Sequence, residues 1–268
     1  MLLSAVLHLR PLSPGALHAD QGRALMKEFL DWVKQANSSM FDELHKPDDT
    51  RPYTVSGLRG NAVRAGDYLL LNPDQVLWWR VTSLDDALSD LIQHIFENRL
   101  PATINISHKP FHILKATVDP NQHEWAGIAT YDELDSNPDS SPELIQVEFA
   151  SPTTFRSDGK NQPFPLPRYL ANQWLQKWNK YSKKEPIPDQ IIDYADACLA
   201  VSRYEICSQD VQHGKATYIG FTGFCRYRIL EYHPFWTGKL LSLARFSFYC
   251  GTGAKTSFGL GQTRVIGA

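Results

Sequence analysis

The chain has few cysteines and no long apolar run among its 268 residues. Its four cysteines, at positions 198, 207, 225 and 250, form no C-x-x-C pair, so neither a zinc ribbon nor a disulfide framework is indicated. No segment approaches the roughly 20 apolar residues that span a bilayer, and the apolar N-terminal stretch lacks the basic start of a signal peptide. We therefore expect a soluble cytoplasmic protein with reduced thiols and no membrane partner.

An excess of basic charge is also missing. The net charge is −2, which argues against a generic nucleic-acid binder. The average conceals an asymmetry, because residues 1–150 hold 12 Lys and Arg against 21 Asp and Glu, whereas residues 151–268 hold 15 against 8. An acidic half joined to a basic half suggests that one half meets a polyanion, with simple surface solvation as the alternative.

Glycine is concentrated near the C-terminal end, in the loop Cys250–Gln262 with the sequence CGTGAKTSFGLGQ. The spacing does not fit a Walker A loop, because Ala254 precedes Lys255. It does not fit a G-x-G-x-x-G fingerprint either, because Thr256 is sixth from Gly251. Backbone N–H groups of such a loop can cradle phosphate oxygens. A glycine-rich turn that lets two strands pack closely is an equally good interpretation.

The periodicity of apolar residues predicts two successive β-α-β-β-α-β units around an acidic segment at 132–143. The first unit has a strand at 2–10, a helix after residue 20, strands at 68–71 and 76–82, a helix at 83–98, and strands at 102–107 and 111–118. The second has a strand at 144–150, a helix at 166–181, strands at 199–209 and 216–230, a helix at 236–248, and a strand at 263–266. The fold class is therefore α+β, with two tandem ferredoxin-like (RRM-like) domains at 1–135 and 143–268. Because RNA-recognition modules share this layout, RNA is the leading candidate for the phosphate ligand.

Several segments, taken in order, resemble the CRISPR-associated repeat endoribonucleases of the RAMP superfamily. They are Leu44-His45-Lys46-Pro47 followed by Pro52-Tyr53-Thr54-Val55-Ser56, then Ser151-Pro152-Thr153-Thr154-Phe155-Arg156, Leu166-Pro167-Arg168, Gly220-Phe221-Thr222-Gly223-Phe224 and the glycine-rich loop. The resemblance spans nearly the whole chain. It implies tandem ferredoxin-like domains and metal-independent cleavage of precursor CRISPR RNA. In that reaction the 2′-hydroxyl attacks the adjacent phosphate and leaves a 2′,3′-cyclic phosphate or 3′-phosphate and a 5′-hydroxyl.

The resemblance places the catalytic histidine at His45, in a segment that reads as a polar loop. Imidazole suits proton exchange with the 2′-hydroxyl and the 5′-oxygen because its pKa lies near neutrality. Arg51 stands where some relatives carry a lysine that steadies the phosphorane charge, and Tyr53 is either a proton donor or a packing residue. Some relatives have a catalytic tyrosine in the first helix, where this chain has none, so the second catalytic residue is left open. His18, just before the first helix, is either the backup catalytic histidine or a helix-start residue.

The predicted RNA-binding residues are in the glycine-rich loop and in a basic group around the start of the second-domain helix. They are Gly251, Gly253, Lys255, Thr256, Ser257, Gly259, Gly261, Arg156, Lys160 and Arg168. Lys177, Lys180, Lys183 and Lys184 continue along and beyond this helix, where RNA contact and a solvated helix face are equally good interpretations. Trp174 and Trp178 are expected in the core, and Phe258 stacks on a base or fills the core.

No cofactor and no metal are expected, because Lys109-Pro110 interrupts His108-x-x-x-His112 and the segment reads as extended. The expected partner is CRISPR repeat RNA, either as a stem-loop or unstructured. Other subunits of a crRNA-guided interference complex and a second copy of the chain are further candidates. The alternative function is a non-cleaving RNA-binding subunit of such a complex. A metabolic enzyme that holds a phosphorylated ligand is more remote, since the charge split and the doubled fold argue against it.

Overall fold

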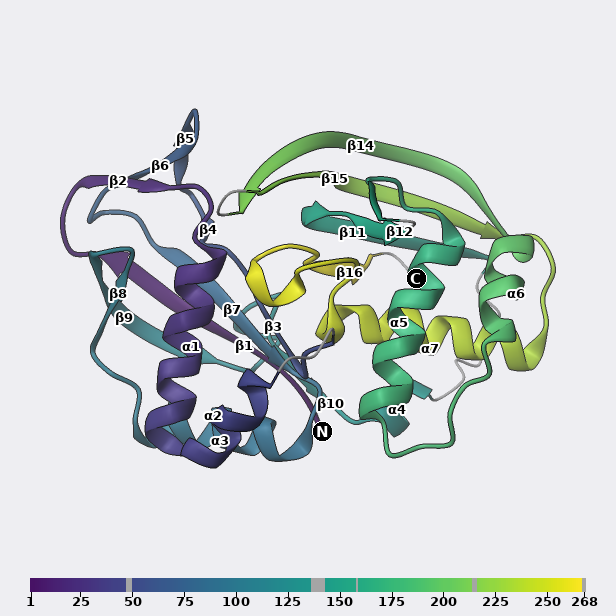
Figure 1. The fold of residues 1–268 in the computed structure, drawn as a ribbon, viewed down its shortest axis with the longest axis horizontal. Helices are drawn as coiled ribbons and strands as arrows, with labels where there is room; N and C mark the ends of the chain where they lie inside the picture. Colours follow the sequence, from purple (N-terminus) through teal and green to yellow (C-terminus); the bar gives the residue numbers. More distant parts are fainter. Residues whose placement is uncertain (47–49, 136–142, 158, 214–215, 267–268) are drawn as a thin grey trace. The chain divides into compact units, whose positions relative to one another are not determined.

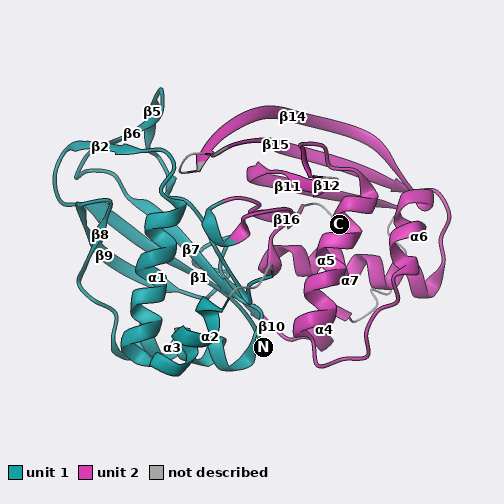
Figure 2. Ribbon diagram, viewed as in Figure 1, with its two compact units in different colours: residues 1–128, 257–259 teal, residues 129–256, 260–268 magenta. Residues whose placement is uncertain are grey.

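The computed structural model describes residues 1–46, 50–135, 143–157, 159–213 and 216–266. The chain forms two compact units (Figures 1 and 2). Unit 1 consists of residues 1–128 together with 257–259, and unit 2 of residues 129–256 with 260–268. Three residues of the glycine-rich loop are therefore part of unit 1, although the chain on both sides of them belongs to unit 2. No helix in the described ranges has the length and apolar content needed to cross a membrane.

Unit 1 is built on an antiparallel sheet with the strand order β3-β7-β1-β9-β8. Its strands are β1 (Leu2–Pro11), β3 (Tyr53–Val55), β7 (Leu77–Ser83), β8 (Thr103–Ile106) and β9 (Lys109–Thr117). Helix α1 (Gly22–Ala36) lies between β1 and β3 in the chain. Helix α3 (Asp86–Asn98) connects β7 to the β8–β9 hairpin. Leaving out β8, the path β1-α1-β3-β7-α3-β9 is the predicted β-α-β-β-α-β order, with β1 and β7 in the centre.

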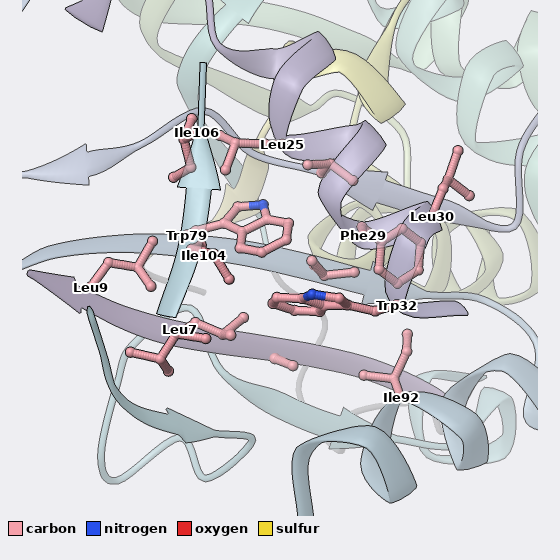
Figure 3. Close-up of a cluster of buried hydrophobic side chains, with 14 of the residues drawn as sticks. Leu7, Leu9, Leu25, Phe29, Leu30, Trp32, Trp79, Ile92, Ile104 and Ile106 are labelled. Carbon is pink, nitrogen blue, oxygen red and sulfur yellow. The ribbon is translucent and has the colours of Figure 1, made fainter. Parts of the chain in front are cut away.

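The core of unit 1 lies between one face of this sheet and the two helices (Figure 3). Strand β1 contributes every second residue, including Leu7 and Leu9, as the period of two in a strand requires. Trp79 on β7 pairs with Leu7 and packs its ring 5.2 Å from that of Trp32 on α1, measured between centroids. This packing fixes α1 against the sheet and so sets the position of the chain that leaves its C-terminal end.

The strand at 68–71 is present but does not have the expected partner. It is β6 (Tyr68–Leu71), which pairs with β2 (Gly15–His18) and β5 (Val63–Ala65) in a separate three-stranded sheet. The position beside β7 is taken by β3, whose three residues are all buried. A three-residue segment buried at every position shows no alternation, which is why periodicity did not identify it. The short strands β4 (Arg59–Gly60) and β10 (Gly127–Ala129) pair with β7 and β1.

Unit 2 repeats the same topology, with the sheet order β14-β15-β11-β16. The strands are β11 (Leu144–Thr153), β14 (Leu199–His213), β15 (Ala216–Ile229) and β16 (Thr263–Val265). The helices are α4 (Tyr131–Asp135), α5 (Pro167–Tyr181), α6 (Gln190–Cys198) and α7 (Pro234–Cys250). A hairpin of β12 (Phe155–Ser157) and β13 (Lys160–Gln162) precedes α5, and a 3₁₀ turn, η1 (Thr256–Phe258), lies in the glycine-rich loop. The chain is therefore a pair of tandem ferredoxin-like domains.

Helix α4 differs from the expected division, which placed residues up to 135 in the first domain. The ring of Tyr131 packs against Trp178 and Phe246 at centroid distances of 5.0 and 5.6 Å. The Asp135 carboxylate accepts hydrogen bonds from Lys239 Nζ and Ser242 Oγ at 2.8 and 3.2 Å. These contacts attach α4 to unit 2, so the chain passes from one unit to the other before it.

Candidate functional site

His45 lies at the end of a short helix rather than in a loop. Helix α2 (Ser38–His45) follows α1 directly, and the Asn37 side chain caps its N-terminus by accepting a hydrogen bond from Met40 N at 3.1 Å. The His45 ring is exposed and lies 4.3 Å from the Phe41 ring, one turn earlier, between centroids. An imidazole that packs on one side and is open to solvent on the other can exchange protons with a bound substrate.

Arg51 is held beside the C-terminal end of the same helix. Its Nη1 donates a hydrogen bond to the backbone oxygen of Leu44, the residue before His45. A cation is favourable there because the last carbonyl groups of a helix carry partial negative charge. Two of the predicted catalytic residues, His45 and Arg51, are therefore brought to one helix end. Residues 47–49 between them lie outside the described chain.

Tyr53 is in the core, which favours its packing role over that of a proton donor. It is 1% exposed, and its ring lies 5.1 Å from that of Phe29 on α1. Burial raises the pKa of its hydroxyl to about 12, although Arg51 acts in the opposite direction. A buried phenol in strand β3 cannot reach a substrate, so Tyr53 is a packing residue and not a proton donor.

The other histidines of unit 1 that the sequence singled out lie in strands or in a turn. His18 ends β2, where its Nδ1 accepts a hydrogen bond from Asp20 N at 3.1 Å and its ring lies 5.7 Å from that of Tyr68. His108 lies in the turn between β8 and β9 with φ of 66°, while His112 belongs to β9. Among the residues that the structure describes, no group of three or more His, Cys, Asp or Glu side chains is arranged to hold a metal ion.

The glycine-rich loop packs tightly against residues 152–154, at the end of strand β11. Thr252 N donates to Gly261 O, Ala254 N to Thr154 O and Gly261 N to Pro152 O, at 2.8, 2.8 and 3.0 Å. A Cβ at Gly253 would lie 2.4 Å from Thr154 O. The close-packing interpretation therefore explains this glycine, and these three N–H groups are already bonded within the protein.

Gly251 and Gly261 face each other across the loop, each with a positive φ, of 65° and 67°. A Cβ at Gly261 would lie 2.1 Å from Thr252 O, and one at Gly251 would lie 2.8 Å from Gly261 O. The side chains of Thr256 and Ser257 are buried, at 8% and 7% exposed. Lys255, by contrast, is exposed and has a left-handed backbone with φ of 60°. Among the loop residues that were predicted to contact RNA through their side chains, Lys255 is exposed, whereas Thr256 and Ser257 are buried.

The tip of the loop contacts the start of α1, which the sequence did not indicate. A Cβ at Gly22 would lie 1.8 Å from Phe258 O, and Gly259 forms a parallel bridge with Ser56 just after β3. The half-buried Phe258 and its neighbours are therefore part of unit 1. The contact requires glycine at position 22, the first residue of α1, because any side chain there would collide with the backbone of Phe258.

The basic group around the start of α5 is exposed. Arg156 lies on β12 opposite Asn161, Lys160 lies on β13 opposite Ser157, and Arg168 is in the first turn of α5. Arg168 Nη1 lies 3.4 Å from the carboxylate of Asp196, with both side chains about half exposed (51% and 45%). The β12–β13 hairpin begins one residue after Thr154, so it is joined to the glycine-rich loop through the Ala254–Thr154 hydrogen bond.

Lys177 fits neither interpretation that the sequence allowed. It is 5% exposed, and its Nζ donates to Cys250 O and, at 3.0 Å, to Thr256 Oγ1. Trp174, one turn earlier, donates from Nε1 to Thr252 Oγ1 at 2.9 Å. Lys184 forms ion pairs with Asp132 and Asp135 at 2.7 and 2.9 Å, whereas Lys180 is exposed. Trp174 and Trp178 are buried, as predicted.

Comparison with known proteins covers both units. The family model described as the CRISPR Cas6 N-terminal domain matches residues 1–136, and that of the CRISPR-associated endoribonuclease Cas6 matches residues 147–263. A Mycobacterium tuberculosis Cas6 endoribonuclease is 29% identical over 122 residues, which are 45% of this chain and 38% of that relative's length. A Streptococcus thermophilus Cas6 endoribonuclease is 22% identical over 87% of both chains.

The fold is also that of a solved Cas6. A Thermus thermophilus Cas6, in a product complex, superposes with a TM-score of 0.82 and 23% identity, covering 99% of this chain and 100% of that one. Because the family models together match most of the chain, in the order of its two units, the chain belongs to the Cas6 family of CRISPR-associated endoribonucleases.

Proposed function

We propose that this protein is a metal-independent endoribonuclease that processes precursor CRISPR RNA by cutting within the repeat. The observation that carries the proposal is the match of both units to the Cas6 endoribonuclease family. The exposed His45 on the end of α2, with Arg51 bonded to the same helix end, supplies the chemistry. The alternative, a non-cleaving RNA-binding subunit on the same fold, gives no role to this pair.

The proposed reaction uses the 2′-hydroxyl of the nucleotide before the cut as the nucleophile. Its oxygen forms a bond to the adjacent phosphorus as the bond from phosphorus to the 5′-oxygen breaks. His45 accepts the proton of the 2′-hydroxyl and returns one to the leaving 5′-oxygen. The Arg51 guanidinium stabilises the charge that develops on the phosphorane oxygens. The products are a 5′-hydroxyl and a 2′,3′-cyclic phosphate, which a water molecule hydrolyses to a 3′-phosphate by breaking the bond from phosphorus to the 2′-oxygen.

RNA binding is proposed to use the exposed cations of unit 2. Lys255 projects from the glycine-rich loop, and Arg156, Lys160 and Arg168 are exposed on the neighbouring hairpin and helix start. Such contacts to phosphate position an RNA without reading its sequence. Gly253 supports this surface, because its close packing on Thr154 and the hydrogen bond from Ala254 N to Thr154 O anchor the chain just before Lys255.

The proposal extends to the setting of the protein. A chain that cuts CRISPR transcripts acts in the cytoplasm. Its product stays bound or passes to other subunits of a crRNA-guided complex, and a second copy of the chain can share one RNA. Size-exclusion chromatography of the purified protein with and without cut repeat RNA distinguishes these arrangements.

The test is incubation of the purified protein with repeat RNA from its own genome in EDTA. We expect a single cut with a cyclic-phosphate end, and His45→Ala to slow it by about 10²–10⁴ with nearly unchanged binding. The matched control is His94→Ala, which removes another exposed helical histidine and leaves cutting unchanged. Cutting by His45→Ala at the wild-type rate contradicts the assignment and makes His18 the next candidate. Tight binding without cutting by the wild type favours the non-cleaving subunit.

A further inference from the structure

Lys177 is a buried lysine on a helix face otherwise made of core residues. Helix α5 buries Leu170, Ala171, Trp174, Leu175 and Trp178 together with Lys177. Lysine is almost never fully buried unless its ammonium has partners. Burial disfavours the charged form of Lys177 and so lowers its pKa. A position that would suit an apolar side chain is therefore occupied by a group that needs hydrogen-bond acceptors.

The acceptors of Lys177 lie at the two ends of the segment 250–256. Cys250 is the last residue of α7, and its carbonyl group is among those that have no partner within a helix. Lys177 Nζ donates to this carbonyl and also to Thr256 Oγ1, at 3.0 Å. One ammonium group thus caps α7 and ties the beginning of the glycine-rich loop to its turn η1.

Thr256 is held on its other side by the two facing glycines. Its Cγ2 lies 3.0 Å from the place of a Cβ at Gly251 and 2.9 Å from that of a Cβ at Gly261. The threonine methyl group therefore fills the space that these glycines leave, while the hydroxyl group accepts from Lys177. Trp174 adds a second hydrogen bond from α5 to the loop, from Nε1 to Thr252 Oγ1 at 2.9 Å.

Lys255 directly precedes Thr256 and has a backbone that L-residues rarely adopt, with φ of 60°. Such a conformation persists where the surrounding structure imposes it. The residues on both sides are anchored, because Ala254 N is bonded to Thr154 O and Thr256 Oγ1 to Lys177. The direction in which Lys255 leaves the loop thus depends on these anchors.

We propose that Lys177 is a positioning residue for RNA binding, which fixes the glycine-rich loop so that Lys255 presents its ammonium group to an RNA phosphate. The inference rests on the proposed function, because it takes repeat RNA as the ligand of the loop. Lys177 itself touches no RNA, since its side chain is buried beneath the loop. Its contribution to binding acts through Lys255.

The test is a double-mutant cycle on the full-length protein, with the affinity for uncut repeat RNA as the measurement. Lys177→Met removes the ammonium group and keeps an unbranched side chain in the buried position. We expect Lys177→Met and Lys255→Ala each to weaken binding by on the order of tenfold, and the double variant to bind no more weakly than Lys255→Ala. The control is Lys27→Met, which removes an exposed lysine of α1 and leaves affinity unchanged.

The salt dependence separates positioning from a general loss of structure. The logarithm of the affinity falls as the logarithm of the salt concentration rises. If Lys177 acts through Lys255, Lys177→Met makes this dependence less steep by the same amount as Lys255→Ala, a change in slope of about 0.7–0.9 for one phosphate contact. A structural role alone weakens binding without changing the slope, and its effect adds to that of Lys255→Ala. Either of those results overturns the inference.

A second variant covers the case in which Lys177→Met does not fold. Thr256→Val removes the hydroxyl acceptor, keeps the shape that fills the space between the glycines, and leaves Lys177 bonded to Cys250 O. We expect it to weaken binding in the same direction and again without effect in the Lys255→Ala background. If Lys177→Met and Thr256→Val both bind with wild-type affinity while Lys255→Ala binds more weakly, the positioning role of Lys177 is overturned and the proposed function is not affected. Unchanged binding by Lys255→Ala removes the loop from the proposed function itself.

Discussion

At the scale of single residues, burial distinguishes groups that are close in the sequence. His45 is exposed at the end of α2, whereas Tyr53, eight positions later, is 1% exposed against Phe29. A proton donor must come within hydrogen-bond reach of the substrate, which a residue in the core cannot do. The same reasoning separates the exposed Lys255 from the buried Lys177 in unit 2.

Tyr53→Phe is expected to leave the rate of cutting unchanged, because the ring and its packing are retained. Tyr53→Ala, which removes the ring, is expected to lower the free energy of unfolding by about 3–5 kcal/mol. Single-turnover cutting and urea unfolding measure the two effects. A loss of more than about 10²-fold in the rate of Tyr53→Phe would return the phenol to the catalytic set.

Gly253→Ala is expected to destabilise the protein and to weaken RNA binding. The new Cβ would lie 2.4 Å from Thr154 O, and the backbone has φ of 81°. The matched control is Gly159→Ala, at φ of 74° with no atom within 4 Å, where the conformational cost alone, about 1–2 kcal/mol, applies. Thermal unfolding of both variants is the measurement. Equal loss in the two would show that the contact with Thr154 contributes nothing.

At the scale of elements, the sequence predicted the strands and helices with clear periodicity. The pattern of apolar residues along the chain identified β1, α1, α3 and α5. Neither β3 nor α2 has such a pattern, because three buried residues do not alternate and eight residues make little more than two turns. The strand at 68–71 was predicted, but its partners were not, since β-propensity does not specify which strand lies alongside.

Helix α4 is held to unit 2 by an ion pair whose strength depends on pH. Burial raises the pKa of Asp135, but hydrogen bonds from Lys239 and Lys184 outweigh it and leave the pKa below its ordinary value of 3.8. The folded state therefore binds this proton less readily than the unfolded state. The stabilisation is complete above the unfolded pKa and is lost as pH falls through the lower folded pKa.

Urea unfolding at decreasing pH is expected to show this loss in the wild type and a flatter profile in Asp135→Asn. Asp132→Asn is the control, because the Asp132 side chain is 87% exposed although it also pairs with Lys184. We expect it to follow the wild-type profile. Identical profiles for all three proteins would show that α4 does not depend on the charge of Asp135.

At the scale of the whole molecule, the sequence predicted the doubled fold, which the structure confirms, and it supplied the candidate residues of the proposed site. The resemblance led to His45 and Arg51, and the glycine pattern led to Lys255. The sequence did not reveal that Lys177 is buried, because a lysine on a helix is usually solvated. No pattern marked Cys250 and Thr256 as its hydrogen-bond acceptors. Nor did it show that residues 257–259 complete unit 1, which requires contacts between distant segments.

Gly22→Ala tests the contact between the loop tip and α1. Because the added Cβ would lie 1.8 Å from Phe258 O, we expect lower thermal stability and weaker RNA binding. Gly57→Ala is the matched control, since its Cβ would meet Gln21 Oε1 at an ordinary 3.7 Å. Equal melting temperatures for Gly22→Ala and the control would contradict the assignment of the loop tip to unit 1.

The inclusion of residues 257–259 in unit 1 has a consequence for folding during synthesis. The ribosome makes the chain from its N-terminus, and domains usually fold in that order. Unit 1 receives its last segment after all but the final residues of unit 2 have been made. Until then the start of α1 lacks its contact with Phe258, so a nascent chain that stops early would hold an unfinished first domain.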